Sequence, residues 1–173
     1  MWTIRRDKGL SEIINMWSSF VFKKEPSAEL HIYGLTNNFS KKILEYYKNI
    51  GIKFFGIVNK KILANKYSYS TAMIHPGYDE TFCISALEAQ ASGLPILTFN
   101  RTALSERVVD GVNGYKVCSF QEMSKKVLEL INNKSLHKKL SINSIKLSKK
   151  YSWEIIALSW YQYLKKIELD YSY

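Results

Sequence analysis

The chain alternates short runs of apolar and β-branched residues with longer segments whose apolar residues recur at helical spacing. Six runs have the length and composition of strands: residues 2–4, 28–34, 52–56, 71–76, 94–99 and 114–117. Strands that are apolar on both faces are typical of a parallel sheet buried between two layers of helices. The pattern therefore predicts an α/β fold, with a parallel sheet of about six strands and helices on both faces.

The segments between and after these runs are predicted to be helices. They lie at about residues 10–22, 40–49, 59–66, 82–92, 120–132, 135–150 and 152–168. Asn132 and Asn133 separate two of the last three helices, and Ser152 is a candidate N-cap for the final one. The sequence shows no internal repeat and no linker, so we expect one domain over residues 1–173 that ends in the helices of residues 120–168.

Ligands of open parallel sheets bind outside the carboxyl ends of the strands. The candidate ligand-binding positions are therefore the segments that directly follow the predicted strands. These are residues 34–38, 56–59, 75–82 and 100–104.

The formal net charge is +10, from 25 basic and 15 acidic side chains. This charge is compatible with nucleic acid, an anionic membrane surface or phosphorylated small molecules as partners. Lysine pairs recur along the predicted C-terminal helices, where a solvated helix face is the simplest interpretation. The sequence has no zinc-finger spacing and no RNA-binding signature, so we expect no nucleic-acid partner, whereas peripheral contact with a membrane stays open.

Two cysteines, Cys83 and Cys118, provide neither a disulfide framework nor a metal-binding pattern. No apolar run reaches the length of a membrane span, and the first residues do not resemble a secretory signal. We therefore expect a cytoplasmic protein, with the inner face of the membrane as a possible peripheral location.

Two glutamates lie eight positions apart around the start of the helix that follows residues 71–76. If that helix begins near Thr81 or Phe82, Glu88 shares a face with Ile84 and Leu87 and points into a partly buried region. A buried carboxylate needs a partner, and a ligand rich in hydroxyl groups is one such partner. The alternative is structural: Ser85 and Glu88 match a capping box.

Glu80, on the preceding loop, would face the same space as Glu88. The helix N-terminus near residues 82–84 adds a site for phosphate oxygens. A ligand with both hydroxyls and phosphates, such as a nucleotide sugar, would satisfy all three features. Other chemistries fit less well, because the sequence has no Asp-x-Asp pair for magnesium, no G-x-G-x-x-G fingerprint and no P-loop.

The ordered motifs from residue 75 to residue 117 resemble the signature region of retaining glycosyltransferases of the GT-B fold, family four. The match consists of Glu80 and Glu88, the run 88–95 (EAQASGLP), Glu106, and the Gly-x-x-Gly of residues 111–114. Lys8-Gly9-Leu10, the run 31–34, the run 54–58 and Tyr151-Ser152-Trp153 extend the resemblance over about residues 3–168. It implies a Rossmann-like donor-binding domain, the C-terminal half of a GT-B fold.

The resemblance also implies roles for individual residues. Glu88 would bind the ribose hydroxyls of a nucleoside diphosphate sugar, and Glu80 would lie beside the transferred sugar. The remaining donor-site residues implied by the resemblance are Ile57 and Val58 toward the base, Thr81, Phe82 and Cys83 toward the sugar and diphosphate, and Gly34.

Fixed cations would stabilise the departing diphosphate. Lys8 matches the family's lysine, and Arg5 or Arg6 takes the place of its arginine, whose usual position is held by Thr3. Cys83 departs from the family, which often has glycine there. The implied reaction transfers a sugar with retained anomeric configuration, without a metal or other cofactor, to a saccharide or lipid acceptor.

GT-B enzymes bind the acceptor in an N-terminal half that these 173 residues do not contain. An excised domain, a truncated gene product and a subunit that needs a partner chain all remain open as interpretations. A non-catalytic domain that binds a nucleotide or a partner chain is the alternative function. His75 is interpreted as a strand-end residue rather than a catalyst, and Trp160, Tyr163 and Leu164 as an interface with the missing half.

Overall fold

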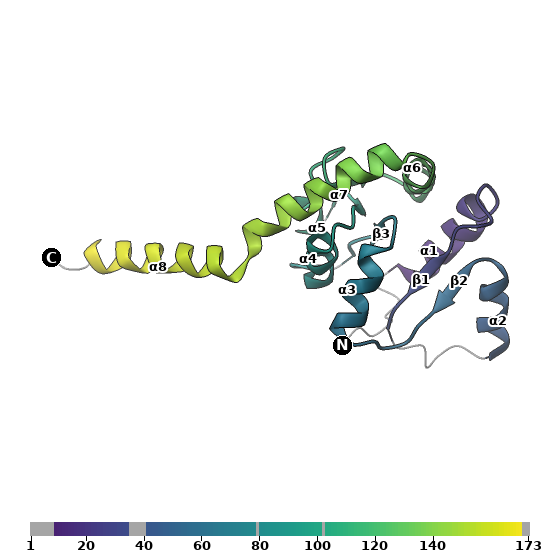
Figure 1. The fold of residues 1–173 in the computed structure, drawn as a ribbon, viewed down its shortest axis with the longest axis horizontal. Helices are drawn as coiled ribbons and strands as arrows, with labels where there is room; N and C mark the ends of the chain where they lie inside the picture. The colour runs from purple at the N-terminus through teal and green to yellow at the C-terminus, as the bar shows by residue number, and fades with distance from the viewer. Residues whose placement is uncertain (1–8, 35–40, 79, 102, 171–173) are drawn as a thin grey trace.

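A computed structural model of the chain describes residues 9–34, 41–78, 80–101 and 103–170 (Figure 1). All strands in this part of the chain are parallel, and they form two sheets. The first sheet pairs β1 (Leu30–Ile32) with β2 (Ile52–Phe54). The second has the order β3-β4-β5, from β3 (Met73–Ile74), β4 (Ile96–Phe99) and β5 (Gly114–Val117).

The α/β class and the parallel strands are confirmed, but the prediction of one continuous sheet of about six strands is wrong for the described residues. Five of the six predicted strands are present, and β1 does not pair with β3. The sixth predicted strand, residues 2–4, lies outside the described residues. Residues of β1 and β3 line a common cavity, and within the described residues these two strands do not pair.

Eight α-helices lie in the described residues, and seven of them correspond to predicted segments. They are α1 (Leu10–Met16), α2 (Lys41–Asn49), α3 (Lys60–Ser68), α4 (Ile84–Ala91), α5 (Ala103–Glu106), α6 (Phe120–Asn132), α7 (Lys134–Ser148) and α8 (Trp153–Asp170). Helix α1 continues as a π-helix, η2 (Trp17–Val21), and α7 ends in a 3₁₀ turn, η3 (Lys149–Tyr151). Helix α5 was not predicted, because four residues are too short for a periodic pattern.

Side-chain caps explain where three of the helices begin. The Oδ1 atom of Asn59 accepts a hydrogen bond from the Ile62 N–H at 2.8 Å, and the Oγ atom of Ser119 accepts one from the Glu122 N–H at 3.1 Å. Asn133 both ends α6 and caps α7, where its Oδ1 accepts from the Leu136 N–H at 2.9 Å. These short polar side chains satisfy N–H groups that a helix leaves unpaired at its start.

Strand β4 is buried on both faces and divides the core into two clusters. Leu97 and Phe99 belong to the larger cluster, which includes buried residues of α1, η2 and α6. Ile96 belongs to the smaller cluster, with Cys83 and Leu104. Alternate residues of a strand point to opposite faces, so helices cover both sides of the three-stranded sheet, as the sequence predicted.

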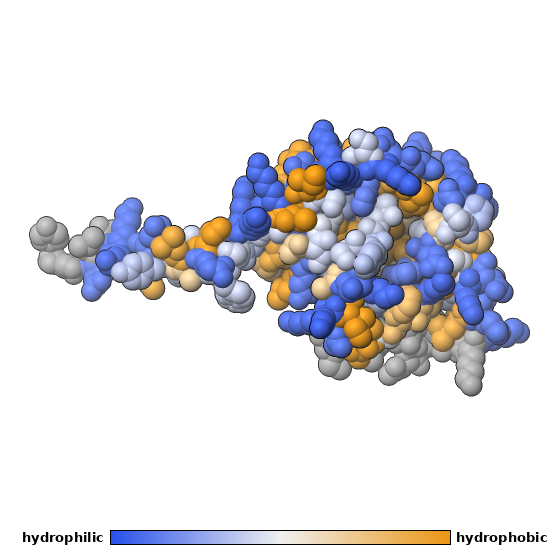
Figure 2. All heavy atoms as spheres, in the orientation of Figure 1, coloured by the Kyte–Doolittle hydropathy of each residue, from blue (hydrophilic) through white to orange (hydrophobic). Residues whose placement is uncertain are grey.

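Helix α8 extends away from the rest of the molecule at the C-terminal end (Figure 1). Several of its large side chains are exposed, and Figure 2 shows hydrophobic residues on its surface. They are Trp153, Ile155, Leu158, Trp160, Tyr161, Tyr163 and Leu164. Within the described residues, no helix combines the length and hydropathy needed to cross a bilayer.

Candidate functional site

The carboxyl ends of β1 and β2 meet at two glycines. The Gly34 N–H donates a hydrogen bond to the Gly56 carbonyl at 2.8 Å, which joins the segments that leave these two strands. Ile57 follows with its side chain exposed, and Val58 is half-buried. Three of the predicted donor-site residues, Gly34, Ile57 and Val58, therefore lie together at one edge of the two-stranded sheet.

Glu88 lies on α4, which follows the carboxyl end of β3. The fully buried face of this helix carries Ser85, Ala86, Ala89 and Gln90, whereas Glu88 is half-buried, as the sequence predicted. Ile84 is exposed, and 39% of the Glu88 side chain is exposed. Ala86 packs with Ile96 of β4 in the smaller core cluster, and the exposed part of the Glu88 carboxylate is accessible to a ligand.

The residues that follow β2 lie next to Glu88. The Lys60 Nζ is 3.9 Å from the Glu88 Oε1, and Lys60 is almost fully exposed. Such a pair contributes little to stability, because solvent screens both charges. The pair does show where Lys60 lies: the loop that contains Ile57 and Val58 ends beside the Glu88 carboxylate of α4.

Helix α4 begins at Ile84, later than the sequence indicated. Its N-cap is Cys83, whose φ of 54° and ψ of 73° place it in the left-handed region, and no side chain caps the helix. Ser85 lies inside the helix, so the capping box of Ser85 with Glu88 does not form. The left-handed conformation is unfavourable for a residue that has a Cβ atom. The surroundings of Cys83 therefore hold its backbone in this conformation.

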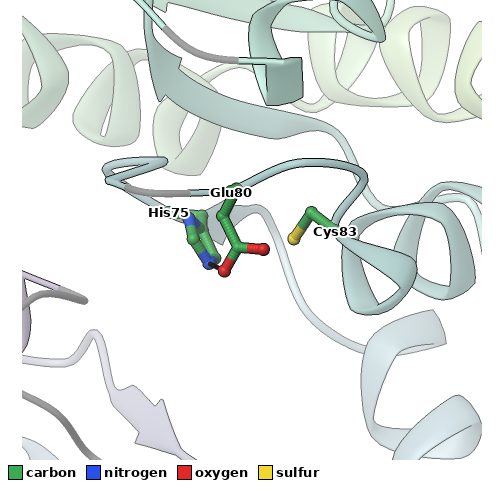
Figure 3. A group of neighbouring side chains, drawn as sticks. All are labelled: His75, Glu80 and Cys83. Carbon is green, nitrogen blue, oxygen red and sulfur yellow. Dashed lines mark ion pairs between the residues drawn. The ribbon is translucent and has the colours of Figure 1, made fainter.

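Glu80 is the more buried of the two glutamates, with 10% of its side chain exposed. Its Oε1 lies 3.5 Å from the Nε2 of His75, which stands at the carboxyl end of β3 (Figure 3). The Nδ1 of His75 accepts a hydrogen bond from the Gly77 N–H at 2.9 Å. A neutral imidazole that accepts at Nδ1 carries its proton on Nε2, so the ring directs an N–H toward the Glu80 carboxylate.

His75, Glu80 and Cys83 also have the residue types of a metal site, with ligand atoms within 4.8 Å of one another (Figure 3). A metal would need the lone pair on the Nε2 of His75. The Gly77 N–H occupies the other ring nitrogen and leaves the proton on Nε2. The group therefore fits a histidine–carboxylate pair better than a metal centre.

Tyr67, on α3, lies within the electrostatic influence of Glu88. Burial raises the pKa of the Tyr67 phenol to about 12, and the negative charge of Glu88 adds to the shift. No pattern in the sequence connects these two residues, which are far apart along the chain. Tyr67 and Lys60 thus place the end and the start of α3 near the α4 carboxylate.

Phe82 is held by a stack of three side chains that the sequence did not reveal. The Arg107 guanidinium carbon lies 3.5 Å from the centre of the Phe82 ring and 4.9 Å from that of Tyr151. Burial lowers the pKa of Arg107, and its two terminal nitrogens have no hydrogen-bond partner among the described residues. The stack fixes the loop before α4 against the turn that precedes α8.

The predicted site residues that the structure describes gather in two neighbouring groups. Gly34, Ile57 and Val58 follow the two-stranded sheet, and Glu80, Thr81, Phe82, Cys83 and Glu88 follow the three-stranded one. Arg5, Arg6 and Lys8, the predicted cations, lie outside the described residues.

Comparison with known protein families identifies the class to which a domain with these positions belongs. Residues 2–147 match the family model described as "Glycosyl transferases group 1". The chain belongs to this family.

Two relatives illustrate the match in sequence. The chain is 31% identical over 150 residues to an uncharacterized glycosyltransferase, MJ1178, of Methanocaldococcus jannaschii, covering 85% of this chain and 41% of that protein. It is 28% identical over 175 residues to the capsular polysaccharide biosynthesis glycosyltransferase CapM of Staphylococcus aureus, covering 95% and 46%. The chain therefore spans less than half the length of either relative.

Solved structures show which part of the fold is present. The C-terminal domain of a glycosyl transferase group 1 family protein, LpcC, from Francisella tularensis matches with a TM-score of 0.71 and 26% identity, over 86% of this chain and 81% of that one. A mutant of TarM of S. aureus, crystallised with fondaparinux, alpha-GlcNAc-glycerol and UDP, matches with a TM-score of 0.78 and 23% identity, over 92% and 33%. The fold is that of the C-terminal domain of GT-B glycosyltransferases.

Proposed function

We propose that this chain binds the donor of a retaining glycosyltransferase, a nucleoside diphosphate sugar, at the carboxyl edge of its strands. The observation that carries the proposal is the convergence of two carboxylates from one side of the molecule with the Gly34 and Gly56 loops from the other. The Lys60–Glu88 pair marks the point where the two sides meet. A ligand that has a base and ribose at one end and a sugar at the other matches this division.

In this proposal Glu88 accepts hydrogen bonds from the ribose hydroxyls. Its carboxylate is accessible and the lysine that pairs with it is almost fully solvated, so a ligand can displace that contact at little cost. Ile57 and Val58 lie beside the base. The backbone of Thr81, Phe82 and Cys83 approaches the diphosphate at the start of α4, where helix geometry favours anions.

Glu80 faces the transferred sugar. The Nε2 of His75 lies 3.5 Å away and holds its carboxylate in one orientation. Lys8 with Arg5 or Arg6 would stabilise the charge that develops on the departing diphosphate, as fixed cations do for phosphoryl leaving groups. The sugar keeps its anomeric configuration because departure and attack occur on the same face.

The acceptor would bind to an N-terminal domain or a partner chain that completes the GT-B fold. The relative CapM is named for capsular polysaccharide biosynthesis, which supports a cell-surface glycan or glycolipid as the product. A domain that binds a nucleotide or a partner chain without transferring sugar is the second candidate.

Calorimetric titration with UDP, GDP and ADP tests the donor site. We expect one of the three to bind, and Glu88→Gln to weaken it by about tenfold to a hundredfold, because a charged acceptor of hydrogen bonds is lost. Glu154→Ala, a change at an exposed position of α8, is the matched control and should bind as the wild type does. Failure of all three nucleotides to bind would overturn the proposal.

A second titration distinguishes the proposed roles of the two carboxylates. Glu80→Gln should weaken the nucleotide sugar while leaving the free nucleoside diphosphate unchanged, because Glu80 is assigned to the sugar alone. Glu88→Gln should weaken both. Equal losses for the two variants with the free nucleotide would show that the assignment of Glu80 is wrong.

A further inference from the structure

Arg107 keeps a charged side chain buried next to the loop that leads into α4. Only 6% of the residue is exposed, and both terminal nitrogens of its guanidinium are buried without a hydrogen-bond partner among the described residues. Burial lowers the pKa of this group, and among the described residues the charges that oppose the shift belong to Tyr151 and Cys83, not to a carboxylate. A buried cation without such partners is costly, so filling space does not explain why an arginine stands here.

The backbone of Arg107 is fixed by two buried amide side chains. Its carbonyl accepts a hydrogen bond from the Nε2 of Gln90 at 3.2 Å and another from the Nδ2 of Asn113 at 3.0 Å. These two residues are 1% and 0% exposed. Gln90 belongs to α4, and Asn113 directly precedes β5. The Arg107 side chain therefore extends from a point that is fixed to α4 and to the three-stranded sheet.

The guanidinium at the end of this side chain contacts two aromatic rings. Its carbon lies 3.5 Å from the centre of the Phe82 ring and 4.9 Å from that of Tyr151, and the two rings meet edge to face with centroids 6.1 Å apart. A planar cation is attracted to the faces of aromatic rings, most strongly where both groups are desolvated. An aliphatic side chain of similar length would fill the space without this directional preference. The arginine therefore favours one position of the Phe82 ring.

Phe82 lies in the short connection between β3 and α4, between two other points of contact. Toward β3, the Nε2 of His75 lies 3.5 Å from the Oε1 of Glu80. Toward α4, Cys83 is 5% exposed and left-handed, and no side chain caps the helix. Phe82 itself is 46% exposed, so burial alone does not hold its ring. The contact with Arg107 ties this part of the connection to α4 and the sheet.

We propose that Arg107 is a positioning residue of the donor site: through Phe82, it holds the backbone of residues 81–83 in the conformation that meets the diphosphate. This inference rests on the proposed function, which places that backbone at the diphosphate. Backbone N–H groups at the start of a helix bind phosphate oxygens only when they are correctly oriented. Because no side chain caps α4, their orientation depends on the residues that lead into the helix. The terminal nitrogens of Arg107 are buried, so it acts through Phe82 and not by touching the ligand.

Arg107→Met separates this role from a role in stability. The variant removes a buried cation that lacks hydrogen-bond partners and keeps an apolar side chain of similar length, so the melting temperature should stay the same or rise. Its affinity for the nucleoside diphosphate that the wild type binds should fall about tenfold, because charge-assisted hydrogen bonds to phosphate are weakened. Its affinity for the monophosphate of the same nucleoside should change by less than about twofold, since the proposed base and ribose contacts lie elsewhere.

Calorimetric titration measures both affinities, and Lys126→Met is the matched control. The Nζ of Lys126, on α6, lies 4.2 Å from the centre of the Tyr115 ring, so this change also removes a cation from an aromatic ring. Lys126→Met should bind both nucleotides as the wild type does.

Maleimide labelling of the cysteines tests the positioning without any nucleotide. Cys83 is buried and should react slowly in the wild type, whereas Cys118 is exposed and serves as the internal reference. In Arg107→Met, Cys83 should react at least about tenfold faster, because the connection before α4 opens more often. Phe82→Leu should have the same effect, and the double variant should react no faster than either single variant, because both act through one contact. Mass spectrometry of the peptides distinguishes the two thiols.

Three results would overturn the inference. Unchanged labelling of Cys83 in Arg107→Met would show that the stack does not hold the connection. Unchanged affinity for the diphosphate would show that the stack has no effect on binding, and equal losses for the diphosphate and the monophosphate would indicate a general structural role. If Arg107→Met does not fold, Phe82→Leu, a change at a partly exposed position, replaces it in both measurements.

The two measurements also distinguish this inference from the proposed function. Failure of the wild type to bind any nucleotide would overturn the donor site and, with it, the role of Arg107 at the diphosphate. Binding by the wild type and equally by Arg107→Met would overturn the role of Arg107 alone.

Discussion

The two sheets of this molecule differ in how completely they are buried. In the three-stranded sheet β4 is buried at every position and three of the four β5 residues are buried, whereas both residues of β3 and every residue of β1 are half-buried. In β2 only Ile52 is buried. The composition of these strands is similar, so the difference comes from their neighbours. Strand β4 has a partner on each edge and a core cluster on each face, whereas β1 pairs with β2 alone among the described residues.

The candidate site takes residues from both the more buried and the less buried part of the molecule. Glu80 and Glu88 come from the well-buried side, which fixes their backbone, and Ile57 and Val58 come from the less buried side. Helix α3 connects them, because it follows β2 and contacts α4. The side with the three-stranded sheet carries the carboxylates, and the side with the two-stranded sheet carries the loops that are proposed to meet the base.

The largest contrast is expected for a phenylalanine in each sheet. Phe99→Ala should lower the free energy of unfolding by about 3–5 kcal/mol, because Phe99 is 2% exposed and packs on Tyr78 and Phe120. Phe54→Ala, in β2, should cost roughly 1–2 kcal/mol, because its ring is only partly buried. Urea unfolding monitored by circular dichroism measures both. Equal costs would contradict the distinction between the two sheets.

The next largest difference is expected between the stability costs of replacing Gly114 and Gly56 by alanine. A Cβ at Gly114 would lie 2.0 Å from the Ile96 carbonyl oxygen, so Gly114→Ala should cost at least about 1–3 kcal/mol by forcing β4 and β5 apart. A Cβ at Gly56 would meet nothing within 4 Å. Gly56→Ala should therefore cost only the strain of its φ of +66°, about 1 kcal/mol. Thermal unfolding of the two variants orders them, and the reverse order would refute the explanation.

The contact between the two halves is tested through Tyr67. Its pKa of about 12 is due mainly to burial and partly to the Glu88 charge, so Glu88→Gln should lower it toward 10. The folded state keeps the phenol proton longer than the unfolded chain does, so stability falls as pH rises from about 10 to about 12 in the wild type. NMR of ¹³C-labelled tyrosine, with Tyr67→Phe for assignment, follows the titration. If the pKa of Tyr67 is the same in Glu88→Gln, the Glu88 charge does not influence this residue of α3.

The smallest effect is expected for Lys60. Lys60→Ala should change the free energy of unfolding by no more than about 0.5 kcal/mol, because the Nζ lies 3.9 Å from the carboxylate in solvent. Urea unfolding provides the measurement, and Lys61→Ala, its exposed neighbour, is the control. A loss above about 1 kcal/mol for Lys60→Ala alone would mean that this pair stabilises the contact between the halves.

Most elements of the fold were predictable from the sequence because their signals are local. Helix α6 was predicted at its observed bounds, since residues 120–132 carry a regular apolar stripe between Ser119 and Asn133. The start of α4 was predicted too early, because Phe82 and Cys83 continue the apolar pattern. The structure shows Phe82 stacked on Arg107 instead, a contact between distant positions that no local pattern contains.

The sequence by itself determined the parallel α/β class, the family, and the pairing of Glu80 with Glu88 around the start of one helix. These follow from periodicity and from motifs of a few residues. Only the tertiary structure decided that Glu80 is the more buried carboxylate, that His75 directs an N–H toward it, and that β1 and β3 line a common cavity without pairing in the described residues. Burial and strand pairing depend on groups brought together from distant positions, and a linear pattern does not encode which of those groups reach one another.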